Sequence, residues 1–144
     1  MPTALVVDDE PLLRRLIRVV LEQGGFHVLT AENGRDAMRA SAAHPGEIDV
    51  LVSDVMMPGM DGRALAERLL EEYPNLPVLF VTGTCDRVEL HECERFPFIE
   101  KPFAPSHLLS TVRKILATHT RHRRNRLAGL SFAHQAGPDR IRKH

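Results

Sequence analysis

The sequence predicts an α/β fold: a doubly wound, five-stranded parallel sheet built from five successive β-α units, (βα)5. Short runs rich in Val, Leu and Ile recur along the chain without polar alternation, which is typical of strands buried on both faces of a parallel sheet. Segments with helical spacing of apolar residues separate these runs. Such alternation favours right-handed crossovers that place helices on both faces of the sheet.

Length and charge distribution indicate one domain followed by a tail. A chain of 144 residues can build one hydrophobic core of ordinary size but not a second full domain. Residues 117–144 contain seven Arg or Lys and one Asp, a net charge of +6, so residues 1–116 sum to −6 because the whole chain is formally neutral. We expect a domain over residues 1–118 and a basic tail over residues 119–144 that is a frayed helix extension or disordered.

Each element of the first two units has its own local signal. An apolar run at residues 4–7 predicts the first strand, and the helix after it starts near Pro11, which is tolerated in a first helical turn, and ends at Gly24-Gly25. The second unit has a strand at residues 26–31 and a turn at Asn33-Gly34. The residues expected to face the sheet are Leu13, Ile17, Val20 and Leu21 in the first helix and Ala37, Met38 and Ala42 in the second helix, which covers residues 35–43.

The last three units follow the same order. A loop with Pro-Gly and Asp-Gly pairs, both of which are turn signals, precedes a helix over residues 62–72. A short polar helix is expected at residues 87–94, and Ser106 can cap a last helix. The strands of these units are expected at residues 50–53, 78–81 and 97–100.

Polar residues stand at the C-terminal ends of four predicted strands. Asp8 and Asp9 follow the first strand, Asp54 the third, Thr82 the fourth and Lys101 the fifth. In a parallel sheet these ends meet at one edge, where ligands bind. Mg²⁺ prefers oxygen ligands and commonly bridges carboxylates to a phosphate. The pattern therefore predicts a site for Mg²⁺ and a phosphoryl group.

Asp54 is the candidate nucleophile of this site. It lies at the predicted centre of the sheet beside a Pro-Gly loop, and a carboxylate can attack phosphorus directly. Lys101 would offset negative charge on the phosphoryl oxygens, and the Thr82 hydroxyl would donate a hydrogen bond to one of them. These three residues would therefore carry the chemistry.

Four motifs together resemble the receiver domain of two-component response regulators. They are Asp8-Asp9, Asp54 with the following Met56-Met57-Pro58-Gly59-Met60-Asp61-Gly62, Thr82-Gly83, and Lys101-Pro102-Phe103. The resemblance covers residues 3–117 and implies a flavodoxin-like fold. It implies a phosphoacceptor signalling switch of a two-component phosphorelay. Such a switch is not an enzyme, although it assists its own phosphorylation and dephosphorylation.

The resemblance also implies roles for individual residues. Asp54 would accept the phosphoryl group from a histidine kinase or a phosphotransfer protein. Thr82 and Phe98 would form a switch pair, in which the hydroxyl moves toward the phosphoryl group and the aromatic ring turns inward. This change would remodel the face formed by the predicted helix at residues 87–94, the fifth strand and the last helix, which would bind a downstream protein or a second copy of the chain in a homodimer. The implied Mg²⁺ ligands are Asp9, Asp54, the backbone carbonyl of Met56 and, through water, Asp8.

Two other functions use features of the same sequence. A hydrolase with an aspartyl-phosphate intermediate would also use Asp54, but it is disfavoured because Met56 stands two positions on, where such an enzyme needs a second carboxylate. The basic tail suggests a nucleic-acid-associated regulator, since basic segments gain affinity by releasing counterions. The tail has no helix-turn-helix or winged-helix pattern, which disfavours sequence-specific DNA recognition.

The sequence also bears on the compartment. Cys85 and Cys93 are too few for a disulfide-stapled scaffold, so we expect reduced thiols. Neither a basic-then-apolar leader nor an apolar stretch of membrane-spanning length is present. We therefore expect a cytoplasmic protein that makes no membrane contact.

Overall fold

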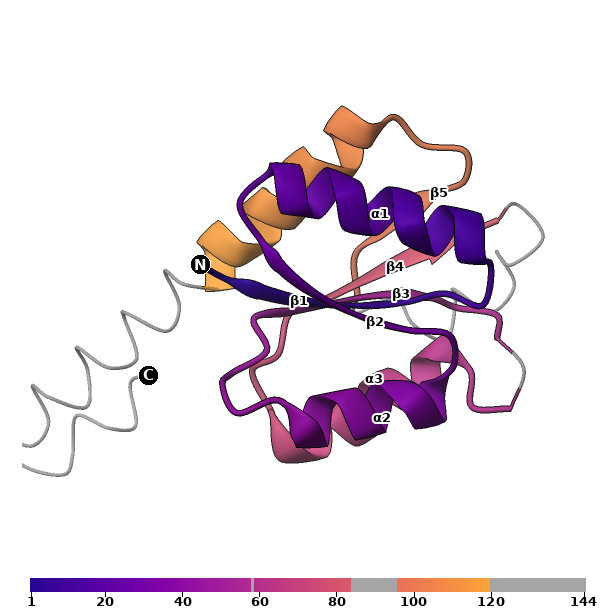
Figure 1. Ribbon diagram of the computed structural model, residues 1–144, viewed down its shortest axis with the longest axis vertical. Helices are drawn as coiled ribbons and strands as arrows, with labels where there is room; N and C mark the ends of the chain where they lie inside the picture. The colour runs from indigo at the N-terminus through magenta and orange to yellow at the C-terminus, as the bar shows by residue number, and fades with distance from the viewer. Residues whose placement is uncertain (58, 84–95, 120–144) are drawn as a thin grey trace, which may run out of the picture.

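The computed structural model describes residues 1–57, 59–83 and 96–119 and contains the predicted sheet (Figure 1). All five strands are parallel and lie in the order β2-β1-β3-β4-β5. The prediction of a five-stranded parallel α/β sheet is confirmed. The strands are β1 (Thr3–Val7), β2 (His27–Ala31), β3 (Val50–Asp54), β4 (Val78–Thr82) and β5 (Phe98–Glu100).

Helices cover both faces of the sheet. The helix predicted at residues 87–94 and the tail from residue 120 onward lie outside the described residues, so the expectations about them stay predictions. Within the described part, no helix is both long and apolar enough to cross a bilayer. One face carries α1 (Pro11–Gln23) and the C-terminal helix, which includes residues 105–119, and the other carries α2 (Gly34–Ala43) and α3 (Gly62–Glu72) (Figure 1).

Each face of the sheet builds its own hydrophobic core, because successive side chains of a strand point to opposite faces. In β1, Leu5 and Val7 belong to the core beneath α2 and α3, whereas Ala4 and Val6 belong to the core beneath α1 and the C-terminal helix. The strands β1, β3 and β4 are buried along their whole lengths, and β2 is partly exposed. The three central strands thus give a densely packed support for the residues at their ends.

Two details of the sequence interpretation are wrong. Ala42 is exposed, and Ser41 takes the inward position in α2, because Ser41 continues the helical spacing of the buried residues before it. Ser106 does not cap the C-terminal helix, because the helix already includes Pro105. The carbonyl of Ala104 accepts the first hydrogen bonds of this helix, at 3.0 and 3.1 Å.

The strand order determines where a site can form. β1 and β3 lie side by side, and the chain adds β2 outside β1 but adds β4 and β5 outside β3. A parallel sheet opens a crevice at such a switch point, at the carboxyl ends of the strands. The residues that follow β1 and end β3 therefore lie at this crevice.

Candidate functional site

Three carboxylates meet at the carboxyl ends of β1 and β3. One carboxylate oxygen from each of Asp8, Asp9 and Asp54 lies within 4.8 Å of the other two. Asp8 and Asp54 are buried, with 1% and 6% of their surfaces exposed, whereas Asp9 is exposed. The sheet thus brings Asp54 next to the adjacent pair Asp8 and Asp9, although Asp54 is far from that pair in the sequence.

The turn after β1 fixes Asp8. Its amide donates to the Ala31 carbonyl at 3.2 Å, next to the end of β2. Its carboxylate accepts from the Glu10 amide at 2.9 Å, and Arg14 Nη1 donates to its carbonyl at 2.8 Å. Because the strand has ended here, Asp8 and Asp9 both reach the crevice, although adjacent residues of a strand point to opposite faces.

Lys101 supplies the positive charge of the site. Its Nζ lies 3.2 Å from Asp54 Oδ2 and 3.5 Å from Asp8 Oδ2. Its backbone amide donates to the Thr82 carbonyl at 2.6 Å, so the end of β4 holds the lysine just beyond β5, and the Lys101–Pro102 peptide is cis. One ammonium therefore contacts carboxylates from two neighbouring strands.

Burial changes the acid–base behaviour of these groups. It raises the pKa of Asp54 to about 6, with the Lys101 ammonium opposing this change and the Asp8 charge adding to it. Burial likewise raises the pKa of Asp8. Burial would lower the pKa of Lys101, but attraction to Asp54 and Asp8 prevails and raises that pKa. The site therefore concentrates more negative charge than its single lysine can offset.

The donor set fits a hard divalent cation. Asp8 Oδ2 is buried and lies 3.5 Å from Lys101 Nζ, but it accepts no hydrogen bond from the described residues. A cation would satisfy this oxygen and offset the excess of carboxylates over ammonium groups. Oxygen ligands of this kind suit Mg²⁺, which keeps several waters and binds one or two carboxylates together with a phosphate. Met56, the remaining predicted ligand, is two residues beyond Asp54, and its amide donates to Asp54 Oδ1 at 3.3 Å.

The two predicted switch residues lie on β4 and β5. Thr82 ends β4, is fully buried, and donates its hydroxyl to the Gly83 carbonyl at 3.2 Å. Phe98 begins β5 and is 47% exposed. The Thr82 hydroxyl thus hydrogen-bonds to the backbone, and the Phe98 ring is about half exposed.

Three contacts that were not predicted from the sequence support the loop after Asp54. Ser53 Oγ donates to the Asp54 carbonyl at 2.8 Å. The Gly62 amide donates to the Val55 carbonyl at 2.8 Å. Asp61 caps α3 by accepting from an amide of its first turn at 2.8 Å. Of these features only the Asp61 cap has a sequence signal, an Asp directly before a helix.

Comparison with known proteins identifies the family. The family model of the response regulator receiver domain matches residues 4–113, a range that includes the three carboxylates, Thr82 and Lys101. This chain belongs to the response regulator receiver domain family. It is therefore a phosphoacceptor signalling domain of two-component systems, as the resemblance in its motifs implied.

Curated relatives of this receiver domain are longer proteins. It is 36% identical over 133 residues to the C4-dicarboxylate transport transcriptional regulatory protein DctD of Pseudomonas aeruginosa, covering 90% of this chain and 28% of that protein. It is 34% identical over 117 residues to the sensor kinase CckA of Brucella abortus, covering 79% of this chain and 12% of that protein. The chain thus spans less than a third of either relative.

Solved structures show the same receiver fold. A two component transcriptional regulator AraC from Clostridium phytofermentans aligns with a TM-score of 0.75 and 30% identity, covering 87% of this chain and 99% of that chain. The signal receiver domain of a signal transduction histidine kinase from Syntrophus aciditrophicus aligns with a TM-score of 0.72 and 32% identity, covering 82% and 92%. Similar receiver domains therefore occur in transcriptional regulators and in histidine kinases.

Proposed function

We propose that this receiver domain takes a phosphoryl group on Asp54 from a histidine kinase or a phosphotransfer protein and signals through protein contacts, without an enzymatic output. One observation carries the proposal: the buried Asp54 carboxylate lies 3.2 Å from the Lys101 ammonium, beside the carboxylates of Asp8 and Asp9. Asp8 is a poorer candidate acceptor, because it is 1% exposed against 6% for Asp54 and accepts a shorter backbone hydrogen bond, 2.9 Å from the Glu10 amide against 3.3 Å from the Met56 amide to Asp54.

Transfer to Asp54 exchanges one bond to phosphorus for another. A carboxylate oxygen of Asp54 forms a bond to phosphorus while the bond from phosphorus to the donor's imidazole nitrogen breaks, and that nitrogen keeps the electron pair. With its pKa at about 6, Asp54 is mostly ionised at pH 7 and able to attack. Lys101 would then pair with a phosphoryl oxygen. Mg²⁺ held by Asp9, Asp54 and the Met56 carbonyl, with Asp8 acting through water, would offset charge on the phosphoryl oxygens.

Thr82 and Phe98 are proposed to convert this event into a signal. The Thr82 hydroxyl would exchange its bond to the Gly83 carbonyl for one to the phosphoryl group, and the Phe98 ring would turn inward. A phosphoryl group can form about one to three charge-assisted hydrogen bonds. Two or three such bonds, at ~1.5 to 3 kcal/mol each, can reach the ~5.5 kcal/mol that reverses a two-state equilibrium. The surface of β5 and the C-terminal helix would then bind a downstream protein or a second copy of the chain.

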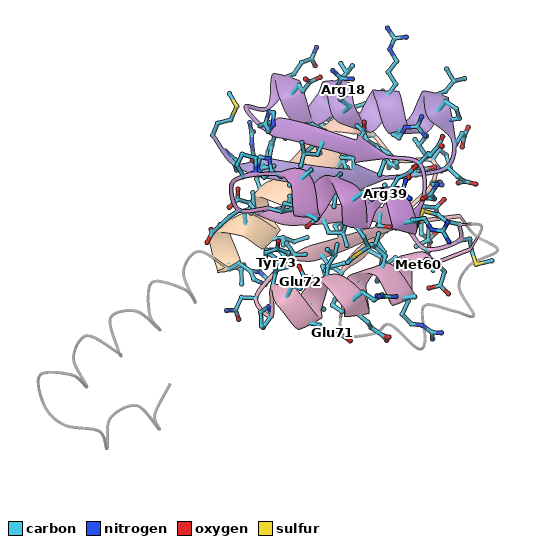
Figure 2. The ribbon with its side chains drawn as sticks, turned by 60° about the horizontal axis from the view of Figure 1, so that its bottom comes forward. Arg18, Arg39, Met60, Glu71, Glu72 and Tyr73 are labelled. Atoms are coloured by element: carbon cyan, nitrogen blue, oxygen red, sulfur yellow. The ribbon has the colours of Figure 1, made fainter. Side chains whose placement is uncertain are left out.

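The surface of α1 suits docking of the sender. Leu12, Leu16 and Val19 are 78%, 42% and 41% exposed, and their spacing of four and three residues places them on one side of the helix. Arg15 and Arg18 border this stripe, and Figure 2 shows Arg18 on α1. Because α1 starts directly after the acidic turn, we propose that an amphipathic helix of the sender packs along α1 and brings its histidine to Asp54.

Acetyl phosphate tests the acceptor. In the presence of Mg²⁺ the wild type should gain one phosphate by intact mass spectrometry, and Asp54→Asn should gain none. Asp49→Asn is the matched control, since Asp49 directly precedes the strand that ends at Asp54, and this variant should react like the wild type. Phosphate uptake by Asp54→Asn would show that the acceptor lies elsewhere.

A panel of purified histidine kinases tests the docking surface. Leu16→Glu places a charge in the exposed stripe and should slow transfer from the most active kinase by about tenfold, the effect of losing ~1.4 kcal/mol of binding. Its reaction with acetyl phosphate should be unchanged, because Leu16 is outside the acidic site. Equal losses with both donors would contradict docking on α1.

A further inference from the structure

Two buried glycines, Gly34 and Gly62, occupy equivalent positions in consecutive helices. Each is the first residue of its helix and follows a capping side chain, Asn33 before α2 and Asp61 before α3. Neither glycine has a positive φ, so alanine could adopt the same backbone conformation at both positions. What glycine provides here is space.

The atoms that a Cβ would meet differ between Gly34 and Gly62. A Cβ at Gly34 would meet the side chain of Met60, with its nearest atoms 2.7 to 2.9 Å away. Figure 2 shows Met60 at the end of the molecule where α2 begins, on the loop before α3. A Cβ at Gly62 would overlap the carbonyl oxygen of Asp54 and lie 3.0 Å from its carbonyl carbon. Relief at Gly34 requires a shift of Met60, including its Cβ, on the loop before α3, whereas relief at Gly62 requires a shift of the Asp54 backbone itself.

A second contact holds the same peptide group. Ser53 Oγ donates to the Asp54 carbonyl at 2.8 Å, and the Gly62 amide donates to the carbonyl of the next peptide group, that of Val55, at 2.8 Å. The peptide group between Asp54 and Val55 is therefore fixed by a hydroxyl and by the close approach of Gly62. The carbonyl and the carboxylate of Asp54 share one Cα atom, so a shift of this peptide would redirect the carboxylate.

We infer that Gly62 and Ser53 are positioning residues for the phosphoacceptor, an inference that rests on the role proposed for Asp54. Together they hold the Asp54 carboxylate at its 3.2 Å distance from Lys101 Nζ and in its place beside Asp8. A displacement of about 1 Å at a reacting group can cost on the order of 100-fold in rate. Gly62 is thus required for the reaction geometry beyond its place at the start of α3.

Gly62→Ala and Gly34→Ala form a matched pair for the test. Three quantities are measured on the full chain: the Mg²⁺ dissociation constant from NMR amide shifts, the initial rate of phosphate uptake from acetyl phosphate at saturating Mg²⁺, and the free energy of unfolding. Gly62→Ala should weaken Mg²⁺ binding about tenfold and slow uptake by on the order of 10- to 100-fold. Gly34→Ala should change both by less than about twofold, because its added methyl group meets Met60 and no atom of Asp54.

Ser53→Ala is a second variant that tests the same inference even if Gly62→Ala does not fold. Loss of the hydroxyl should slow uptake by roughly three- to tenfold, since one of the two restraints remains. Wild-type Mg²⁺ affinity and uptake in folded Gly62→Ala or in Ser53→Ala would overturn the inference, as would equal losses in Gly62→Ala and Gly34→Ala. Phosphate uptake by Asp54→Asn would instead refute the proposed acceptor, and the Mg²⁺ affinities would still report whether Gly62 positions the carboxylate.

Discussion

Asp49 and Asp54 flank the same strand, β3, in opposite electrostatic settings. At the start of the strand, Asp49 Oδ2 accepts from the Thr3 amide at 2.7 Å, and the Asp49 amide donates to the Thr3 carbonyl at 2.8 Å. At its end, the Asp54 carboxylate is buried beside Asp8 and shares Lys101 with it. The first carboxylate ties β1 to β3 and supports the fold. The second carboxylate, that of Asp54, is buried beside another carboxylate and destabilises the folded state, as is typical of functional sites.

Replacing Asp54 should therefore stabilise the protein. The fold raises the pKa of Asp54 from 3.8 to about 6, so keeping it ionised at pH 7 costs the folded state ~3 kcal/mol relative to the unfolded state. Asp54→Asn removes this charge and should raise the free energy of unfolding by about that amount in EDTA, as measured by denaturant titration. Asp49→Asn removes a carboxylate that accepts a hydrogen bond from the Thr3 amide and should show no gain. If Asp54→Asn had the same free energy of unfolding as the wild type, the proposed electrostatic contrast between the two ends of β3 would be wrong.

The acidic end of β3 could be predicted from the sequence because the ends of parallel strands converge through topology alone. Asp8, Asp54 and Lys101 each follow a short run that identifies a strand, whatever path the loops take. The contacts of Ser53 and Gly62 could not be predicted in this way, because they depend on the path of the loop between β3 and α3. An Asp-Gly pair indicates a turn whether or not its glycine approaches the backbone of another residue.

Helix α2 shows a second limit of sequence interpretation. Its C-terminal half contains Ala40, Ser41, Ala42 and Ala43, and side chains this small give almost the same apolar signal in every rotation of the helix. Packing against the sheet selects Ser41 for burial, and its Oγ has no hydrogen-bond partner among the described residues. Strongly apolar positions, such as Ile17 and Leu21 in α1, were predicted correctly because large side chains determine the inward face.

Lowering the pH should reduce the difference between the wild type and Asp54→Asn. Because the pKa of Asp54 is higher in the folded state, the stability cost is complete above pH 6, falls as the pH drops through 6, and vanishes below about 3.8. The ~3 kcal/mol difference at pH 7 should fall to about half that size at pH 5 in EDTA. The raised pKa of Asp8 acts in the same direction, but Asp8 is present in both proteins. A difference that stays constant between pH 7 and pH 5 would contradict the assignment.

Mg²⁺ should stabilise the protein by binding at the Asp54 end of β3 and not at the Asp49 end. At ten times its dissociation constant, a ligand that binds only the folded state adds ~1.4 kcal/mol to the free energy of unfolding. The wild type and Asp49→Ala should gain this amount equally, whereas Asp54→Asn should gain less because it has lost a carboxylate of the site. KCl at matched ionic strength controls for screening of the acidic cluster. Equal gains in all three proteins would place the ion elsewhere.

Asp49→Ala should produce the smallest effect. It removes the acceptor for the Thr3 amide, and a half-exposed hydrogen bond to a charged group is worth about 1 kcal/mol. Asp49→Asn keeps an oxygen acceptor and should lose less, and both variants should take up phosphate from acetyl phosphate at the wild-type rate.

The reason for this expected independence lies in the pairing of the strands. Between the two ends, β1 and β3 remain in register from Ala4 opposite Val50 to Val7 opposite Ser53, and every residue of both strands is buried. Loss of a contact at the start of β3 should therefore loosen that end alone. Slower phosphate uptake in Asp49→Ala would mean that the strand transmits a change along its length, and the acidic site would then depend on the pairing at the far edge of the sheet.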